Sequence, residues 1–182
     1  MKHLDDYLSR IEARDEAAFQ ELYQETKNGV YAIIMAIVKN RQTTEDLMQD
    51  TYIRMLEKLH LYERGRNFQA WLVQIAKNIA YDYVRKSSKQ IVLDPIESSY
   101  VFDQATPTEP LSESPSMIEM IACLDAVESE IILLKVVNDL PFREIATIMN
   151  KPLGTVLWLY QRALKKMKDR KSTRLNSSHG KL

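Results

Sequence analysis

The sequence predicts an all-α protein in which two small helical domains are joined by a flexible acidic linker. Glycine is rare, at 4 of 182 residues, and helix-forming residues dominate. Apolar residues recur every three or four positions over most of the chain, as they do along the buried face of a helix. That period disappears between Ser87 and Pro115, where proline, serine and threonine accumulate among acids. We therefore expect a helical domain on each side of this segment.

The composition excludes several classes of protein. No apolar run approaches the ~20 residues of a membrane span, and the N-terminal MKHLDDYLSR is too charged for a signal peptide. The single cysteine, Cys123, rules out an intrachain disulfide and fits the reducing cytoplasm, and its apolar neighbours indicate a core position. The histidines are scattered and no catalytic or phosphate-binding motif occurs, so we predict no enzyme, metal or cofactor.

The formal net charge is zero, but the charges are segregated along the chain. Residues 61–90 hold six basic and two acidic residues, and residues 131–182 hold eleven basic and three acidic ones. Between them, residues 91–130 contain nine acids and no lysine or arginine. Two basic segments separated by an acidic one indicate two contacts with a polyanion and a connection that avoids it.

Residues 1–89 form the predicted N-terminal domain. We expect helices at Asp15–Thr26, Gly29–Lys39, Thr44–Leu59 and Phe68–Lys86, the third capped by Thr43 or Thr44 and followed by a loop at Leu61–Asn67. The third helix carries an acidic ridge consisting of Asp46, Gln49, Asp50, Ile53 and Glu57. This ridge lies opposite an apolar side formed by Leu47, Met48, Tyr52, Met55, Leu56 and Leu59. Its acids suit a basic protein surface, although an ordinary solvated face would look similar.

The last helix of this domain, WLVQIAKNIAYDYVRK, has an apolar stripe and an unusual opposite ridge. The ridge consists of Trp71, Gln74, Lys77, Asn78, Tyr81 and Arg85. Aromatic rings stack on unpaired bases, cations hold phosphates and an amide can read a base edge, so the ridge favours single-stranded nucleic acid. Trp71 could instead belong to the core, because it flanks the apolar stripe, and Asp82 is better placed for an ion pair than for catalysis.

Residues 116–171 form the predicted C-terminal domain. After helices at 118–124 and 128–138, a short helix at Phe142–Met149 is broken by NKPLG and followed by a longer helix from Leu153 to about Asp169, which is a helix-turn-helix pattern. The outer face of the longer helix presents Thr155, Trp158, Gln161, Arg162 and Lys165. Arginine suits a guanine edge, glutamine suits adenine and lysine suits phosphate. Residues 172–182 have no apolar pattern and look like a non-native tail.

These motifs resemble bacterial sigma factors of the extracytoplasmic-function group. TEDLMQDTYIRMLEKL and FQAWLVQIAKNIAYDYVRK look like their second region, and ESEIILLKVVNDLPFREIATIMNKPLGTVLWLYQRALKKMK looks like their fourth. The resemblance covers residues 15–170 in the family's order, with a linker between. It implies a factor that binds core RNA polymerase, recognises the −10 and −35 promoter elements and melts DNA at the −10 element. It also implies promoter DNA and an anti-sigma factor as partners.

The resemblance assigns roles to the candidate residues. Core polymerase would bind Asp46, Gln49, Asp50 and Ile53; −10 DNA would bind Arg64, Arg66, Asn67, Trp71, Gln74, Lys77, Asn78, Tyr81 and Arg85; −35 DNA would bind Thr155, Trp158, Gln161, Arg162 and Lys165. The loop at Leu61–Asn67 would hold a flipped base, and the acidic linker would pass through the polymerase toward the RNA exit path as a nucleic-acid mimic.

The chain departs from the family at two places. Leu157 and Leu159 stand where relatives often carry lysine or arginine, and Pro141 stands where a capping serine or threonine is usual. Loss of that capping hydroxyl costs about 1 kcal/mol. Two rival readings are a stand-alone helix-turn-helix regulator and an adaptor that binds only proteins. The regulator would bind duplex DNA tightly without polymerase, and the adaptor would tolerate acidic replacements of Lys77, Arg85, Arg162 and Lys165.

Overall fold

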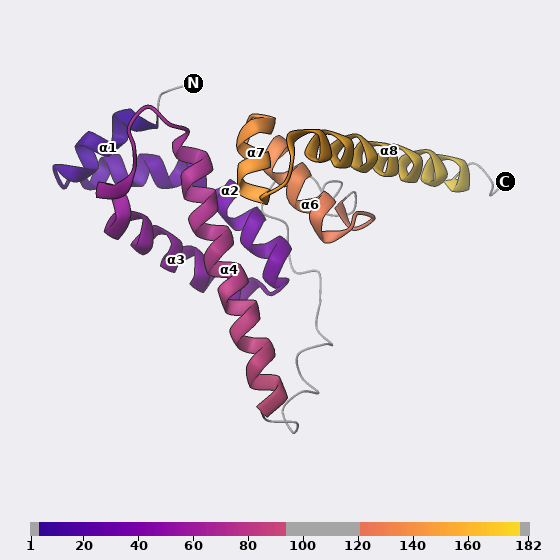
Figure 1. Cartoon of the computed structure of the whole chain (residues 1–182), viewed down its shortest axis with the longest axis horizontal. Helices are drawn as coiled ribbons and strands as arrows, with labels where there is room; N and C mark the ends of the chain where they lie inside the picture. The colour runs from indigo at the N-terminus through magenta and orange to yellow at the C-terminus, as the bar shows by residue number, and fades with distance from the viewer. Residues whose placement is uncertain (1–3, 94–120, 179–182) are drawn as a thin grey trace.

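The computed structural model describes residues 4–93 and 121–178, and within these ranges all regular structure is helical, which confirms the all-α prediction. The N-terminal domain contains α1 (Asp5–Glu12), α2 (Glu16–Val38), α3 (Arg41–Lys58), the 3₁₀ turn η1 (Leu59–Leu61) and α4 (Phe68–Leu93). The C-terminal domain contains α6 (Ala126–Ile132), the π-helical turn η2 (Leu133–Val137), α7 (Phe142–Met149) and α8 (Leu153–Ser178). In Figure 1 α4 runs between α1 and α3 on one side and α6, α7 and α8 on the other.

Two predicted helices in the N-terminal domain are one. Helix α2 runs from Glu16 to Val38 without a break, and Gly29 lies inside it. Asp15 caps its start by accepting hydrogen bonds from the N–H groups of Ala17 and Ala18, and Lys39 ends it in the left-handed conformation. The expected break at Gly29 is wrong because tertiary packing on both sides of this residue outweighs the ~1 kcal/mol that glycine costs in a helix.

The start of α3 also differs from the prediction. Asn40, not Thr43 or Thr44, is the N-cap, since its side chain accepts a hydrogen bond from the N–H of Thr43. Thr44 lies buried one turn inside the helix, where its hydroxyl donates to the carbonyl of Asn40. The error arose because asparagine and threonine are both good caps and the sequence offers three of them in a row of five residues.

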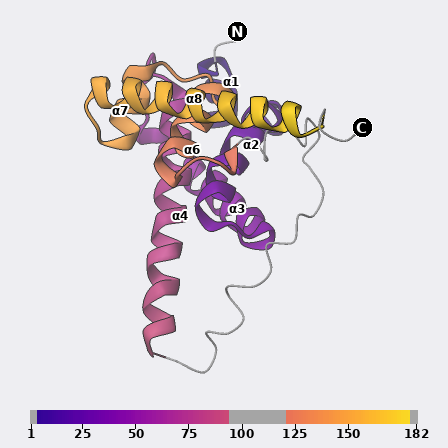
Figure 2. The same cartoon turned by 90° about the vertical axis from the view of Figure 1, so that its right-hand side faces the viewer.

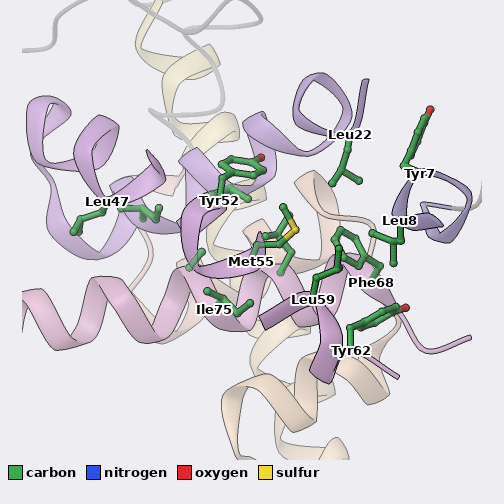
Figure 3. Packing of buried hydrophobic residues seen from close by; sticks show 14 of the residues in the cluster. Tyr7, Leu8, Leu22, Leu47, Tyr52, Met55, Leu59, Tyr62, Phe68 and Ile75 are labelled. Atoms are coloured by element: carbon green, nitrogen blue, oxygen red, sulfur yellow. The ribbon is translucent and has the colours of Figure 1, made fainter. Parts of the chain in front are cut away.

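The core of the N-terminal domain is built from the apolar faces of all four helices (Figure 3). Its fully buried members include Leu22, Met55 and Leu72, from α2, α3 and α4. Two polar groups are satisfied within it, because the hydroxyls of Thr26 and Tyr52 are 2.7 Å apart. This core fixes which sides of α3 and α4 face outward.

The helix-turn-helix is confirmed at 142–178. Asn150 ends α7 in the left-handed conformation, which asparagine tolerates, and α8 begins three residues later. Pro141 provides no side-chain cap to α7, as expected. Upstream, Asp125 and Glu128 form a capping box at the start of α6. Residues 122–124 form a turn, and the predicted helix at 118–124 lies partly outside the described residues.

The two domains pack against each other, which the sequence did not predict. One hydrophobic cluster combines Ile33, Ala70 and Val73 of the N-terminal domain with Leu134, Ile145 and other residues of the C-terminal domain. Figures 1 and 2 both show α7 beside α4, with α8 running across the direction of α4. Helix α4 continues to Leu93 and α8 to Ser178, past the predicted domain ends, and most of the predicted linker lies outside the described residues.

Candidate protein-binding and nucleic-acid-binding surfaces

The acidic ridge of α3 is exposed as the sequence predicts. Asp46, Gln49, Asp50 and Glu57 are exposed, and Ile53 is 56% exposed among them. Leu56 differs from the prediction, because it is 44% exposed rather than buried. Ile53 and Leu56 are three residues apart and therefore neighbours on the helix. The ridge thus combines carboxylates with an apolar pair, a composition that suits a protein partner more than solvent alone.

The basic loop before α4 is held by local bonds. Arg64 forms an ion pair with Glu12 of α1, and Arg66 forms one with Glu63. Both pairs are exposed, so they contribute little to stability and exchange easily with other anions. Asn67 accepts a hydrogen bond from the N–H of Ala70 at 3.0 Å and so caps the start of α4.

The ridge on α4 is not uniformly exposed. Trp71 is partly buried against Tyr62 and Phe68, with ring centroids 5.2 and 5.6 Å apart, so the alternative of a core tryptophan is correct. Gln74 donates to the side-chain oxygen of Asn78 at 2.9 Å, which leaves the amide group of Asn78 exposed. This bond does not use the Nδ2 donors of Asn78, which are the groups that could bind an acceptor on a base edge.

The C-terminal domain covers the middle of the same ridge. Lys77 lies 2.9 Å from Glu130 of α6, and both side chains are largely buried, at 12% and 4% exposure. The hydroxyl of Tyr81 donates to the other carboxylate oxygen of Glu130, and burial together with this bond raises the pKa of Tyr81. The expected exposure of Lys77 is therefore wrong. We call the three residues Lys77, Tyr81 and Glu130 the inter-domain contact.

A second inter-domain contact depends on Gly29. The side-chain oxygen of Asn138 accepts a hydrogen bond from Gln69 of α4 at 2.7 Å, while its nitrogen donates to the carbonyl of Leu133. A Cβ atom on Gly29 would lie 2.1 Å from this Asn138 oxygen. Only glycine at this position allows the close approach. The sequence signal was a glycine within an otherwise good helix pattern, which often marks close packing.

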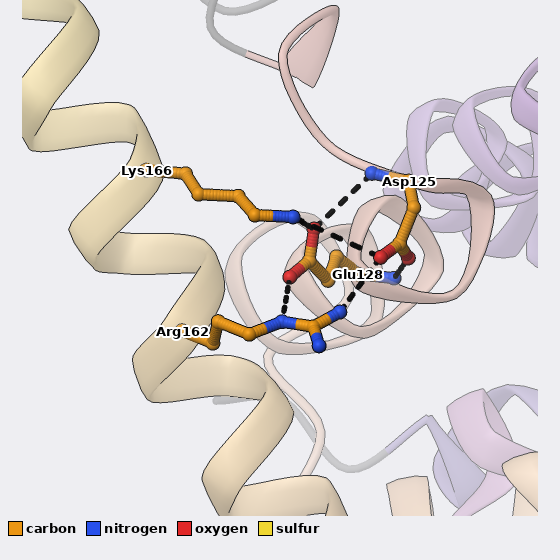
Figure 4. Close-up of polar contacts among 4 residues, drawn as sticks. All are labelled: Asp125, Glu128, Arg162 and Lys166. Atoms are coloured by element: carbon orange, nitrogen blue, oxygen red, sulfur yellow. Dashed lines mark hydrogen bonds and ion pairs between the residues drawn. The ribbon is translucent and has the colours of Figure 1, made fainter.

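A buried carboxylate ties α6 to α8 (Figure 4). Glu128 has no solvent exposure and accepts hydrogen bonds from Arg162 and from Lys166, the latter at 2.7 Å. Burial alone would raise the pKa of Glu128, but the bonds from Lys166, Arg162 and the N–H of Asp125 outweigh it and lower the pKa to about 2. Arg162 also pairs with Asp125 at 2.7 Å.

The outer face of α8 is open. Val156, Leu159 and Ala163 are buried beneath it, so Leu159 belongs to the core. Thr155, Gln161 and Lys165 are exposed, Trp158 is 58% exposed and Leu157 is 40% exposed. Of the five candidate residues on this helix, Arg162 alone forms ion pairs with acids of its own domain, Asp125 and Glu128. Its guanidinium group lies 4.7 Å from the centre of the Trp158 ring.

Comparison with known families accounts for both domains. Residues 22–90 match the family described as Sigma-70 region 2, and residues 116–167 match Sigma-70, region 4. The chain is an extracytoplasmic-function sigma factor. It directs promoter-specific initiation of transcription. Groups of histidine, cysteine and acids able to hold a metal are absent from the described ranges, as is any helix long and apolar enough to cross a membrane.

Several curated relatives of this sigma factor are similar over most of its length. SigW of Bacillus subtilis is 27% identical over 82% of this chain and 86% of its own length, and RpoE of Cereibacter sphaeroides is 29% identical over 87% and 89%. BldN of Streptomyces coelicolor is 28% identical over 88% of this chain, which spans 62% of that longer relative.

Solved structures show the same fold. The sigma factor RpoE of Bartonella quintana, in complex with the anti-sigma factor NepR, has a TM-score of 0.70 at 22% identity and covers 83% of this chain and 94% of its own. CnrH, in complex with the cytosolic domain of CnrY, has a TM-score of 0.62 at 18% identity and covers 93% and 97%.

Proposed function

We propose that this sigma factor docks on core RNA polymerase through the acidic ridge of α3. Asp46, Gln49 and Asp50 would meet a basic surface of the polymerase, and Ile53 with Leu56 would supply the apolar centre. The observation that carries this proposal is the exposed Ile53–Leu56 pair within a row of acids, on the side of the domain away from its core. The acids would also repel DNA, which keeps this side for protein.

The N-terminal domain, residues 1–89, would bind and melt the −10 element through the loop and the ridge of α4. Asn78 and Gln74 would read base edges, Tyr81 would stack on an unpaired base, and Arg64, Arg66, Lys77 and Arg85 would hold phosphates. Trp71 would act through the aromatic cluster that it shares with Tyr62 and Phe68, and Asn67 by capping α4. Stacking of about 1–3 kcal/mol per base offsets the cost of unstacking.

Binding of −10 DNA would require the two domains to separate. In the structure the two domains are packed together, an arrangement that we call closed. Here Glu130 binds the Lys77 ammonium group and the Tyr81 hydroxyl, which a phosphate or base would otherwise contact. A carboxylate and a phosphate compete for the same cation, so the inter-domain contact and the −10 DNA exclude each other. Docking on polymerase would hold the domains apart and remove this competition.

The C-terminal domain, residues 116–171, would bind the −35 element with α8 in the major groove. Thr155, Trp158 and Gln161 would lie at base edges, and Lys165 would contact phosphate. Arg162 would orient Trp158 rather than read a base.

The acidic segment 90–115 would link the two domains, and residues 172–182 would contribute nothing to the binding of polymerase or DNA. We further propose a cytoplasmic, non-catalytic protein that uses no cofactor and can be held by an anti-sigma factor, since the similar RpoE structure is a complex with the anti-sigma factor NepR.

The docking proposal is tested by combining Asp46→Lys with Gln49→Ala in the full chain. We expect this double variant to lose core-polymerase binding, measured by fluorescence anisotropy, and to start no transcripts in vitro on a promoter library. Glu16→Lys with Gln20→Ala is the matched control, because it makes the same changes on the exposed face of α2. Unchanged affinity in the first variant would refute the docking assignment. Tight promoter binding without polymerase would favour a stand-alone regulator.

A further inference from the structure

The outer face of α8 has an unusual chemistry for a helix that reads DNA. At ~100° per residue, Gln161 lies opposite the buried Val156 and Ala163, with Leu157 on one side and Trp158 on the other. Leu157 and Trp158 are 40% and 58% exposed. Exposed apolar side chains grouped around one amide usually mark a binding surface rather than a solvated face.

The fold directs Arg162 away from the outer face of α8. Arg162 is the first arginine of α8, and its Nε and one terminal nitrogen are bound to Glu128 and Asp125 (Figure 4). Two parallel N–H groups are needed to bind the O6 and N7 atoms of guanine. Glu128 is fully buried and fixed by Lys166 as well, so the guanidinium is held along the domain surface rather than directed outward.

The groups that remain match adenine and thymine. In the major groove, thymine presents a C5 methyl group, which apolar side chains contact, and adenine presents a donor–acceptor pair that glutamine can bind with both amide atoms. Guanine presents two acceptors, for which Leu157 has no donor and Trp158 has a single indole N–H. Lys165 lies more than three turns from the start of α8, where phosphate contacts are more common than base contacts.

Given the proposed function, on which this inference rests, we infer that this chain recognises an A·T-rich −35 element through thymine methyl groups. Leu157 and Trp158 contact the methyl groups, Gln161 contacts an adenine, and Arg162 positions Trp158 without touching DNA. Leu157, which stands where family members often carry lysine or arginine, and its neighbour Trp158 therefore set the specificity of the −35 contact.

The test uses holoenzyme assembled from the full chain and core polymerase. Transcription from a library with a randomised −35 region first selects the element, and we expect A·T pairs at the selected positions. Thymine is then replaced by deoxyuridine at one position at a time, which removes only the methyl group. We expect promoter binding to fall about threefold to fivefold at one or two positions, as loss of one buried methyl group predicts.

Variants separate the possible outcomes. Leu157→Ala should abolish the response to deoxyuridine at the position that Leu157 contacts, whereas Leu164→Ala, which changes an exposed leucine two turns further along α8, should keep it. Two results would overturn this inference but leave the proposed function intact. The first is selection of a guanine-containing element that Arg162→Ala no longer selects, and the second is promoter binding that deoxyuridine leaves unchanged. If the transcripts showed no −35 preference and Trp158→Ala weakened binding to the polymerase, the outer face of α8 would be assigned to a protein partner. A complete lack of promoter-specific transcripts would overturn the proposed function as well.

Discussion

The α4 ridge and the outer face of α8 look alike in sequence but differ in the folded chain. Each helix sets polar and aromatic residues opposite an apolar stripe, and each was expected to face DNA. Yet the α4 ridge is partly closed by Glu130, whereas the α8 face stays open around Gln161. In the same chain, therefore, the proposed −35 contact on α8 is exposed, while the proposed −10 contact on α4 is partly covered by the other domain. In this protein the covered contact is the one that would meet melted DNA.

The covering contact is also imperfect. The Glu130 oxygen nearest Lys77 forms an ion pair at 2.9 Å but has no hydrogen-bond partner, although it is buried. A buried carboxylate oxygen without a hydrogen bond is costly, and a buried ion pair often only compensates for its own desolvation. The ion pair of the inter-domain contact therefore adds little to the free energy that holds the two domains together.

The largest expected effect comes from Glu130→Ala. Without the carboxylate, the buried Lys77 ammonium group would have no counter-ion in the closed arrangement and only the Ile148 carbonyl and the Met149 sulfur as acceptors. This costs several kcal/mol, which opening relieves. We expect acetylation of Lys77, followed by mass spectrometry, to become at least tenfold faster, and affinity for a single-stranded −10 oligonucleotide to rise in parallel. Asp139→Asn is the control, because it removes one exposed acid from the same domain. Equal Lys77 reactivity in both variants would show that Glu130 does not hold the domains together.

A smaller opening is expected from Gly29→Ala. The new methyl group would displace the Asn138 side chain and break its bond to Gln69, which weakens the closed arrangement by about 1–1.4 kcal/mol. Lys77 acetylation should therefore become roughly five to ten times faster, while α2 itself gains helix propensity. Gly154→Ala offers a matched control, since a Cβ there meets nothing within 4 Å. An identical Lys77 reactivity in both alanine variants would contradict the role given to Gly29.

The sequence predicted which faces are polar, but not which of them another domain covers. The period of three and four residues located the stripes of α3, α4 and α8, because periodicity reports burial within one domain. The packing of Ala70 and Val73 against the other domain involves contacts far apart in sequence, which periodicity cannot report. The closure depends on Glu130 and Asn138, which flank the mostly apolar stretch 131–137 and are buried in the fold, and the sequence pattern does not mark that burial.

Local competition between side chains caused the remaining misses. Asn40, Thr43 and Thr44 are all good caps, so the sequence alone did not fix the start of α3, which in the fold follows Asn40. Arg162 follows the pattern of a base-reading residue, yet the buried Glu128 from another helix binds it first. Such pairings join segments that only the fold brings together, so a helical wheel assigns Arg162 to the outer face without revealing its partner.

Protonation of Glu128 should affect stability rather than opening. Its carboxylate has a pKa of about 2 in the folded chain, below the value of about 4.3 for an unfolded glutamate. Its stabilising contribution is therefore complete above about pH 5 and is lost as the pH falls toward 2. Glu128→Gln should lower the free energy of unfolding by roughly 2–3 kcal/mol at pH 7, measured by urea titration. The deficit should shrink toward pH 2.5. A deficit independent of pH would mean that packing, not charge, explains it.

The smallest effect is expected at the exposed end of the α4 ridge. Asp82 and Arg85 form a pair at 2.7 Å with side chains 53% and 68% exposed, so Asp82→Asn should change the free energy of unfolding by less than about 0.5 kcal/mol. Because Arg85 is freed toward solvent, affinity for single-stranded −10 DNA should rise, by about twofold at low salt. Arg85→Gln should instead reduce the salt dependence of binding by about 0.7 in logarithmic slope, the share of one phosphate contact. Neither variant removes a group from the inter-domain contact, so both should leave Lys77 acetylation unchanged. If Asp82→Asn accelerated that acetylation, the open and covered parts of the ridge would be one coupled surface, and the contrast between them would fail.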